Sequence, residues 1–157
     1  IPGFYRHMGP TNTLGVAPMP PVDVPELKLG DVAAMPGEVH LVDIRPREDQ
    51  AAGLAPGSTA IELGIDFGSW AGWLLPYGAP LVLVARRDQD VAEAVTQLAQ
   101  IGIDSVQGVV YDPPQQGMQE GFDLLDLADF QRRLAEEDEP QLVDVRMPNE
   151  RAAVRWE

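Results

Sequence analysis

The stretch LVDIR at positions 41–45 recurs as LVDVR at positions 142–146, an offset of 101 residues. The likeness extends further, because the two alanines at 51–52 reappear at 152–153, and six of the twelve residues of the first copy are identical in the second. Each copy joins an apolar strand to an Asp and an Arg, then a proline and a short polar helical turn. A period near 100 residues is too long for a solenoid and suits a domain. The chain is therefore predicted to carry one whole module and the start of a second.

Apolar runs and amphipathic helical patterns alternate through the first copy. Strands alternating with helices indicate an α/β fold, a doubly wound parallel sheet that is covered on both faces. The predicted strands are Val39–Ile44, Thr59–Leu63, Leu81–Ala85 and Ser105–Val110, and the predicted helices are Leu29–Met35, Arg47–Ala52, Phe67–Leu75 and Asp90–Ile101. We expect Leu81–Ala85 to be an interior strand with parallel neighbours. We expect helix 67–75 to pack on the sheet through Phe67, Trp70, Ala71 and Leu74.

The flanking segments differ from this alternation. Residues 1–26 hold six of the prolines and are predicted to form an extended arm without a helix. Beyond a linker rich in Pro, Gln and Gly, we predict a helix at Asp126–Glu136, with Asp126 as N-cap, and then a strand at Gln141–Val145. The expected domains are a connector arm over 1–30, an α/β domain over 31–115, a linker over 116–122 and the first part of a second domain over 123–157.

Composition excludes several classes of function. The formal net charge of −14 argues against binding to nucleic acid or to anionic membranes, both of which require clustered Lys and Arg. Without cysteine, the chain has no disulfide, thiolate metal site or cysteine nucleophile. His7 and His40 lie far apart and lack a metal-binding motif. With no 18-residue apolar run and no signal-peptide pattern, we expect a cytoplasmic protein that holds no cofactor or metal in this chain.

The loop after the most apolar strand is where chemistry is expected. In an open parallel sheet, ligands bind beyond the carboxyl ends of the strands, and a loop entering a helix presents backbone N–H groups to anions. This loop consists of Ala85, Arg86, Arg87, Asp88, Gln89 and Asp90. Anion binding through Arg86, Arg87 and the helix start is one interpretation, and a solvated charged loop is the other.

Other polar and aromatic residues are interpreted as structural. Asp43 with Arg45, and Asp144 with Arg146, are predicted to form strand-end pairs in which the Asp caps backbone amides or binds the Arg. A catalytic role for these pairs is the alternative. Trp70 and Trp73 are expected to lie in the core or in an interface, with a ligand stack as the alternative.

These elements resemble rhodanese-type domains in tandem. The family opens with a strand ending in Asp-x-Arg, which is matched by residues 43–45, and continues with Gly-His-Ile-Pro-Gly-Ala, which is matched by 53–58 except that Leu54 replaces His. The family's active loop is a Cys followed by five residues that end in Arg. Here Ala85 stands at the Cys position and Asp90 at the Arg position. The likeness covers about residues 31–111 and, as a truncated second copy, 123–157.

The stretch FGSWAGWLLPYGAPLVLVA at 67–85, with FYRHM near the start, is similar to proteins that join a metallo-β-lactamase-fold domain to rhodanese modules. This resemblance implies an upstream domain of that fold as partner, with Zn or Fe in that domain, and a parent enzyme that handles thiols or persulfides. It implies that the present module is non-catalytic and serves a structural, docking or regulatory role. The alternative is sulfurtransferase activity carried by the rest of the second module, beyond Glu157. We expect the apolar residues of that module to be covered by residues beyond Glu157, by the first module or by a second copy in a homo-oligomer.

Overall fold

The computed structural model describes residues 2–15, 18–114, 117–136 and 141–153. Its contacts divide the chain into two compact units, unit 1 (Ile1–Asp123) and unit 2 (Leu124–Glu157). Each unit is described by itself.

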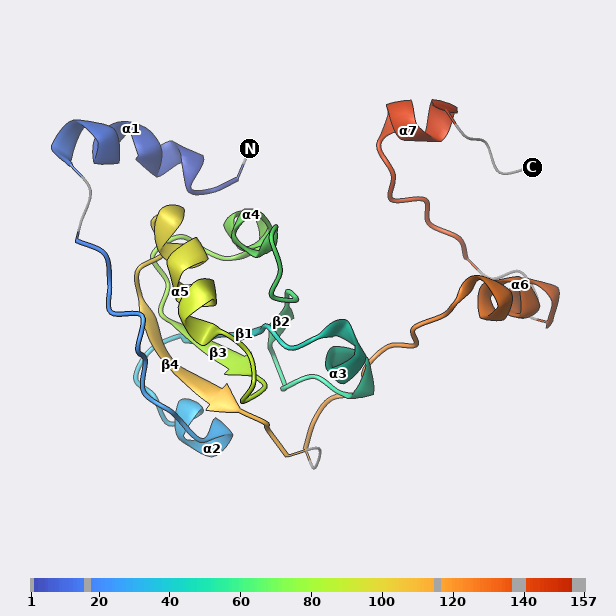
Figure 1. Ribbon diagram of the computed structural model, residues 1–157, viewed down its shortest axis with the longest axis horizontal. Coiled ribbons are helices and arrows are strands. Elements are labelled where there is room, and N and C mark those ends of the chain that lie inside the picture. The colour runs from blue at the N-terminus through green and yellow to red at the C-terminus, as the bar shows by residue number, and fades with distance from the viewer. Residues whose placement is uncertain (1, 16–17, 115–116, 137–140, 154–157) are drawn as a thin grey trace. The chain divides into compact units, whose positions relative to one another are not determined.

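Unit 1 is built on a four-stranded parallel sheet (Figure 1). Its strands are β1 (His40–Asp43), β2 (Thr59–Ala60), β3 (Leu81–Ala85) and β4 (Val106–Tyr111), in the order β2-β1-β3-β4. All five residues of β3 are buried, and β3 pairs in parallel with β1 on one side and with β4 on the other. The predicted interior strand is therefore confirmed, with the predicted bounds.

Two apolar clusters cover the two faces of this sheet. On one face, α4 (Phe67–Leu74) and α5 (Val91–Gln100) pack against β1, β3 and β4, with Phe67, Val95 and Leu98 buried among strand residues such as Leu83. On the other face, α2 (Leu29–Val32) and the chain around it pack against Val82, Val84 and Val110. The short α3 (Arg47–Ala52) follows β1 and has the predicted bounds. Burial of one Leu, Val or Phe side chain stabilises a fold by about 1.5–3 kcal/mol. The elements that cover each face of the sheet therefore both contribute to the stability of unit 1.

The prediction of an arm without a helix is wrong, because α1 spans Tyr5–Leu14. Pro2 precedes the helix, where no intrahelical donor is needed, and Pro10 removes a single donor from its interior. The helix also has tertiary support. The ring of His7 stacks on that of Tyr77, with centroids 3.8 Å apart, and a Cβ built on Gly72 would lie 2.6 Å from Cε1 of Phe4. These contacts with the domain are not visible in a proline count.

Two further elements are several residues shorter than predicted. The helix predicted to reach Met35 ends at Val32, because the amides of Ala34 and Met35 bond three residues back in tight turns. The strand predicted over 59–63 keeps ladder geometry only at 59–60, although the amides of Ile61 and Leu63 still donate to β1 and the residue after it.

The buried face of α4 is only half of the predicted one. Phe67 and Ala71 are buried as predicted, but Trp70 and Leu74 are exposed, and glycines are buried in their place. A Cβ on Gly68 would lie 3.1 Å from the carbonyl oxygen of Gln97 in α5. The two helices approach so closely that small residues face the neighbour. This turns the two tryptophans of α4 outward, so of the predicted placement in the core or in an interface, the core is wrong and the interface stays a prediction.

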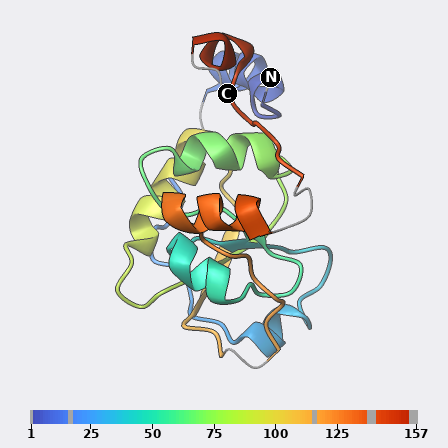
Figure 2. The ribbon, with the colours of Figure 1, turned by 90° about the vertical axis from the view of Figure 1, so that its right-hand side faces the viewer.

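The described residues of unit 2 form two helices, α6 (Leu127–Glu136) and α7 (Pro148–Ala153), drawn in orange and red in Figure 2. The predicted cap of α6 is present, since the amide of Asp129 donates to Oδ1 of Asp126 over 2.8 Å. The predicted strand at 141–145 is absent, and these residues have no regular secondary structure. A strand needs a neighbour for its backbone hydrogen bonds, and the described part of unit 2 contains no other strand. Leu142, Val143 and Val145 are accordingly exposed.

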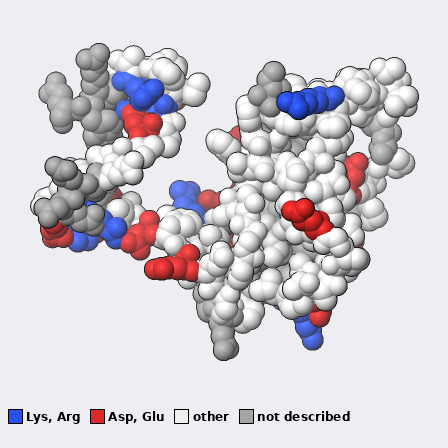
Figure 3. Space-filling view, turned by 180° about the vertical axis from the view of Figure 1, so that it is seen from behind, with Lys and Arg blue, Asp and Glu red and all other residues white. Residues whose placement is uncertain are grey.

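Helix length and surface charge are two general properties of the structure. Among the described residues, no helix is both long enough and apolar enough to cross a membrane. Charged side chains are sparse over the rear face of unit 1 (Figure 3).

Candidate functional site

The loop 85–90 lies at the carboxyl end of β3 and leads into α5. Its first residue, Ala85, ends the strand and is fully buried in the apolar cluster beneath α4 and α5. Asp90 is the N-cap of α5, and its carboxylate accepts a hydrogen bond from the amide of Glu93 over 3.1 Å. Residue 85, where the rhodanese-type pattern has its cysteine, is therefore a buried alanine methyl group. Residue 90, where the same pattern has its arginine, is an aspartate whose carboxylate caps α5.

Side chains of the protein itself already accept hydrogen bonds from two backbone amides of this loop. The amide of Arg86 donates to Oε1 of Gln89 over 2.8 Å, and that of Arg87 donates to Oδ1 of Asp112 over 3.3 Å. The side-chain amide of Gln89 also donates to the carbonyl of Ile44 over 2.8 Å, which ties the loop to the end of β1. An anion that entered here would have to displace acceptors that already satisfy these donors.

Both arginines of the loop are held by carboxylates. Arg87 donates from both terminal nitrogens to Glu26, over 2.7 and 3.2 Å, and its guanidinium lies 4.8 Å from the ring centroid of Tyr111. The hydrogen bond from Arg87 lowers the pKa of Glu26, and the same bond raises the pKa of Arg87. Arg86 pairs with Asp88 over 2.7 Å.

The charge around this loop is negative in sum. Two guanidinium groups pair with four carboxylates, namely those of Glu26, Asp49, Asp88 and Asp112, and the loop also carries the capping carboxylate of Asp90. Exposed pairs of this kind contribute little to stability, on the order of 0–1 kcal/mol, yet they set the local potential. The arrangement is therefore unfavourable for an anionic substrate such as thiosulfate.

The pair at the end of β1 is buried and closed by hydrogen bonds. Arg45 donates from Nε to Oδ1 of Asp43 over 2.9 Å, and from Nη2 to Oδ2 over 2.6 Å and to the carbonyl of Gly53 over 2.7 Å. The backbone amide of Arg45 also donates to Oδ1 of Asp43 over 3.1 Å. Gln50 donates to the carbonyls of both residues, over 2.9 and 2.8 Å. The carboxylate thus both caps an amide and binds the arginine, and this network closes the turn from β1 into α3.

The second copy of the motif closes in the same way without a sheet. The amide and Nε of Arg146 both donate to Oδ1 of Asp144 over 3.0 Å, and Nη2 donates to Oδ2 over 2.8 Å. The hydrogen bond from the Arg146 side chain lowers the pKa of Asp144 to about 2. Because the two side chains are about one third exposed here but buried in unit 1, this geometry belongs to the local Asp-x-Arg sequence and not to its surroundings.

Several residues that hydrogen-bond at the carboxyl edge of the sheet could not be identified from the sequence. Glu26 lies 61 positions from Arg87 and reaches it only because the chain around it pairs with β4, where Leu27 donates to the carbonyl of Val109 over 2.8 Å. Asp112, just after β4, is likewise brought to the loop by strand order. Gln50 is one of the few buried polar residues, although its place on a short polar helix signals exposure.

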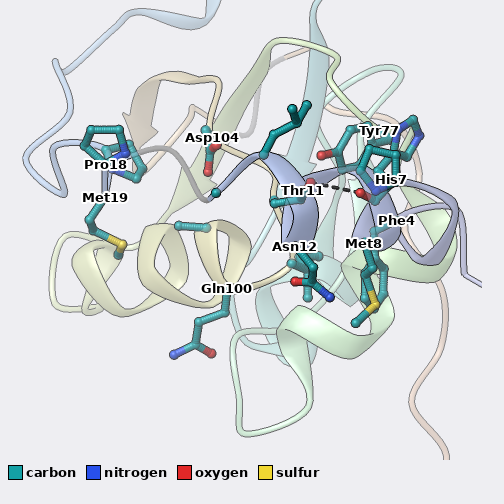
Figure 4. Close-up of a pocket in the computed structure, with 17 residues that line it drawn as sticks. Phe4, His7, Met8, Thr11, Asn12, Pro18, Met19, Tyr77, Gln100 and Asp104 are labelled. Carbon is teal, nitrogen blue, oxygen red and sulfur yellow. Dashed lines mark hydrogen bonds between the residues drawn. The ribbon is translucent and has the colours of Figure 1, made fainter.

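A second feature of unit 1 is a cavity of about 690 Å³ between α1 and the end of α5 (Figure 4). Figure 4 shows His7 against Tyr77 on one side of it and Met19 and Asp104 on the other. Since α5 runs back from the carboxyl edge of the sheet, this cavity lies at the opposite edge from the loop 85–90. Across the described ranges, no group of three or more His, Cys, Asp or Glu residues is placed to hold a metal ion.

Among solved structures, this chain has a distant likeness to a small bacterial protein. The crystal structure of SSP1007 from Staphylococcus saprophyticus subsp. saprophyticus matches with a TM-score of 0.44 at 17% sequence identity, over 61% of this chain and 99% of that one. No protein-family model matches the sequence, and no curated protein matches it.

Proposed function

We propose that unit 1 is a non-catalytic rhodanese-like module with a structural, docking or regulatory role in a larger thiol- or persulfide-handling enzyme. The partner in this proposal is an upstream metallo-β-lactamase-fold domain, which would carry the Zn or Fe. Support comes from the order of strands and helices, from the Asp-x-Arg turn and from the motifs that resemble this family.

The observation that carries the proposal is the state of the loop 85–90. Sulfur transfer needs a thiolate that accepts sulfane sulfur, held in a cradle of free N–H donors. Ala85 offers no nucleophile, and Gln89 and Asp112 take up donors of the cradle. Asp90 adds a negative charge where the resembling family carries a positive one. Each of these features opposes the reaction independently of the others.

A second candidate function rests on unit 2. The Asp144–Arg146 turn has the same hydrogen bonds as the Asp43–Arg45 turn, so unit 2 contains the opening motif of a second such module. Sulfurtransferase activity carried by a cysteine beyond Glu157 is the alternative proposal.

The test is a sulfurtransferase assay with thiosulfate and cyanide on the chain and on a series of variants. We expect no rate above the protein-free control for the unchanged chain. Ala85→Cys should also stay inactive, because its thiol is buried and Asp90 remains; one lost charge-stabilising donor costs about 3 kcal/mol, or roughly a hundredfold in rate. Ala85→Cys with Asp90→Arg and Gln89→Ala is the combination expected to gain a measurable rate.

The matched control is Ala34→Cys, which places a thiol at an exposed position away from the loop. Its rate should equal that of the unchanged chain. A rate in the unchanged chain that survives replacement of both Arg86 and Arg87 would overturn the proposal. Full activity of Ala85→Cys alone would show that the loop is still a working cradle.

A further inference from the structure

The sheet of unit 1 has one edge that is covered and one that is open. The β4 edge is covered by the chain at Pro25–Leu27, which forms a parallel bridge with Val109. At the other edge, the amides of Ile61 and Leu63 donate inward to the carbonyls of Asp43 and Ile44, over 2.9 and 3.1 Å. Because the backbone groups of successive residues in an extended chain point to opposite edges, those of Glu62, between them, are turned away from the sheet. No described residue hydrogen-bonds to it, so this edge offers an unused donor and acceptor.

A groove of about 550 Å³ runs along this open edge. It is lined by Arg47 of α3, by residues 60–67, and by Trp70 and Leu74 of α4. Ile65 is 95% exposed and Trp70 is 58% exposed, so large apolar side chains stand in solvent beside the open backbone. An exposed strand edge flanked by apolar side chains is the arrangement in which an added strand gains main-chain hydrogen bonds and side-chain pockets together.

Charge indicates which kind of strand fits. Glu62 is already paired with Arg47, with Nε and Oε2 3.3 Å apart, whereas the carboxylate of Asp66 has no partner among the described residues. Residues 1–123 contain six Lys or Arg and sixteen Asp or Glu, a formal net charge of −10. A basic side chain on the incoming strand is therefore attracted both by Asp66 and by the unit as a whole.

The same facts disfavour a second copy of this chain as the occupant. Two units of charge −10 repel each other. A stable dimer of independent proteins needs roughly 800 Å² from each partner, and a few side chains around one groove present less than this. A short segment that gains its affinity from main-chain bonds and one aromatic anchor needs no such area.

We propose that the groove beside β2 is a docking site for an extended segment of a partner protein. The segment adds a strand next to Glu62, packs an apolar side chain on Trp70 and places a lysine or arginine near Asp66. This site lies at the sheet edge and is lined by no residue of the loop 85–90, and the proposal does not rest on the absence of catalysis. It goes beyond the proposed function by identifying a surface and the chemistry of its ligand.

The probe is a blocked peptide of alternating lysine and valine, titrated into the full chain and followed by calorimetry and by amide NMR. We expect saturable binding, with the largest amide shift at Glu62. Trp70→Ala should weaken binding by about tenfold or more, because anchors of this type dominate small interfaces. Trp73→Ala is the matched control, since Trp73 is also 58% exposed on α4 but does not line the groove; its effect should stay within twofold.

Two control peptides separate the contributions. The same peptide with every backbone amide N-methylated cannot donate ladder hydrogen bonds, and a peptide of alternating glutamate and valine reverses the charge; both should bind at least tenfold more weakly. Equal loss for the two tryptophan variants, or equal binding of the N-methylated peptide, would overturn the proposal. A dimer in sedimentation that dissociates on Trp70→Ala would overturn it in favour of a second copy.

Discussion

Replacing Arg45 by methionine tests whether burial makes the Asp-x-Arg turn essential in unit 1. Methionine keeps the apolar stem and the approximate volume but removes the guanidinium. The carboxylate of Asp43, which has no exposed surface, would then keep only the backbone amide of residue 45 among its hydrogen bonds. The carbonyl of Gly53 would lose its bond from the same side chain.

The expected loss of unfolding free energy is large. Removing one partner of a buried ion pair costs about 3–5 kcal/mol, because the remaining charge stays buried without compensation. A domain is stable by roughly 5–15 kcal/mol in total, so Arg45→Met removes a substantial fraction. With a urea slope of about 1–3 kcal/mol/M, the midpoint of unfolding should fall by roughly 1–5 M. Urea titration followed by circular dichroism and by amide exchange in β3 measures the change.

The repeat supplies a matched control within the same chain. Arg146→Met removes the same side chain from the same hydrogen-bonding pattern, but at a site where both partners are about one third exposed. Exposed pairs contribute about 0–1 kcal/mol, so the midpoint for unit 1 should not move. If Arg45→Met is unfolded from the outset, Arg45→Lys keeps a charge beside Asp43 and should show an intermediate loss. Equal effects of the Arg45→Met and Arg146→Met changes would refute the reasoning from burial.

Three further predictions concern α1, unit 2 and α5. Gly72→Ala should release α1, because the new Cβ meets the ring of Phe4 at 2.6 Å; faster proteolysis within residues 2–15 at an unchanged unfolding midpoint measures this. The carboxyl of Asp144 should titrate near pH 2 by NMR, and its pKa should return toward 3.8 in Arg146→Met. Because this pKa is lowered on folding, the contribution of the pair is present above about pH 4 and is lost as the pH falls toward 2. Asp90→Ala should destabilise unit 1 by about 0.5–2 kcal/mol in urea unfolding, since the N-cap of α5 is lost.

Each of these changes has a control and a contrary result. Gly64→Ala meets no atom within 4 Å and should leave α1 in place, so equal proteolysis of both glycine variants would contradict the packing of Phe4. Asp88→Ala removes an exposed carboxylate from the same loop without touching the cap, and should change stability by less than about 0.5 kcal/mol. An Asp144 pKa unaffected by Arg146→Met would contradict the pairing in unit 2.

The strands and the central helices of unit 1 could be predicted because their signals are local. Strand β3 is apolar at every position and is buried on both faces, and helix α3 has the bounds expected of a short polar segment between Pro46 and Gly53. The Asp-x-Arg turn is local too, as shown by its formation in both units under different burial. Hydrophobic period, capping residues and breakers act within a few residues of one another, so they can be seen in the sequence alone.

What only the tertiary structure decided depends on segments that are distant in sequence. Proline content alone favoured an extended arm, but contacts with α4 and Tyr77 hold α1 as a helix. The close approach of α4 to α5 buries glycines and turns Trp70 outward, which opens the groove beside β2. Glu26 and Asp112 bind Arg87 of the loop 85–90 because backbone pairing with β4 and the strand order bring them there. The pattern of a helix in sequence shows that one of its faces is apolar. The distance to the neighbouring element then determines which residues of the helix are buried in the contact.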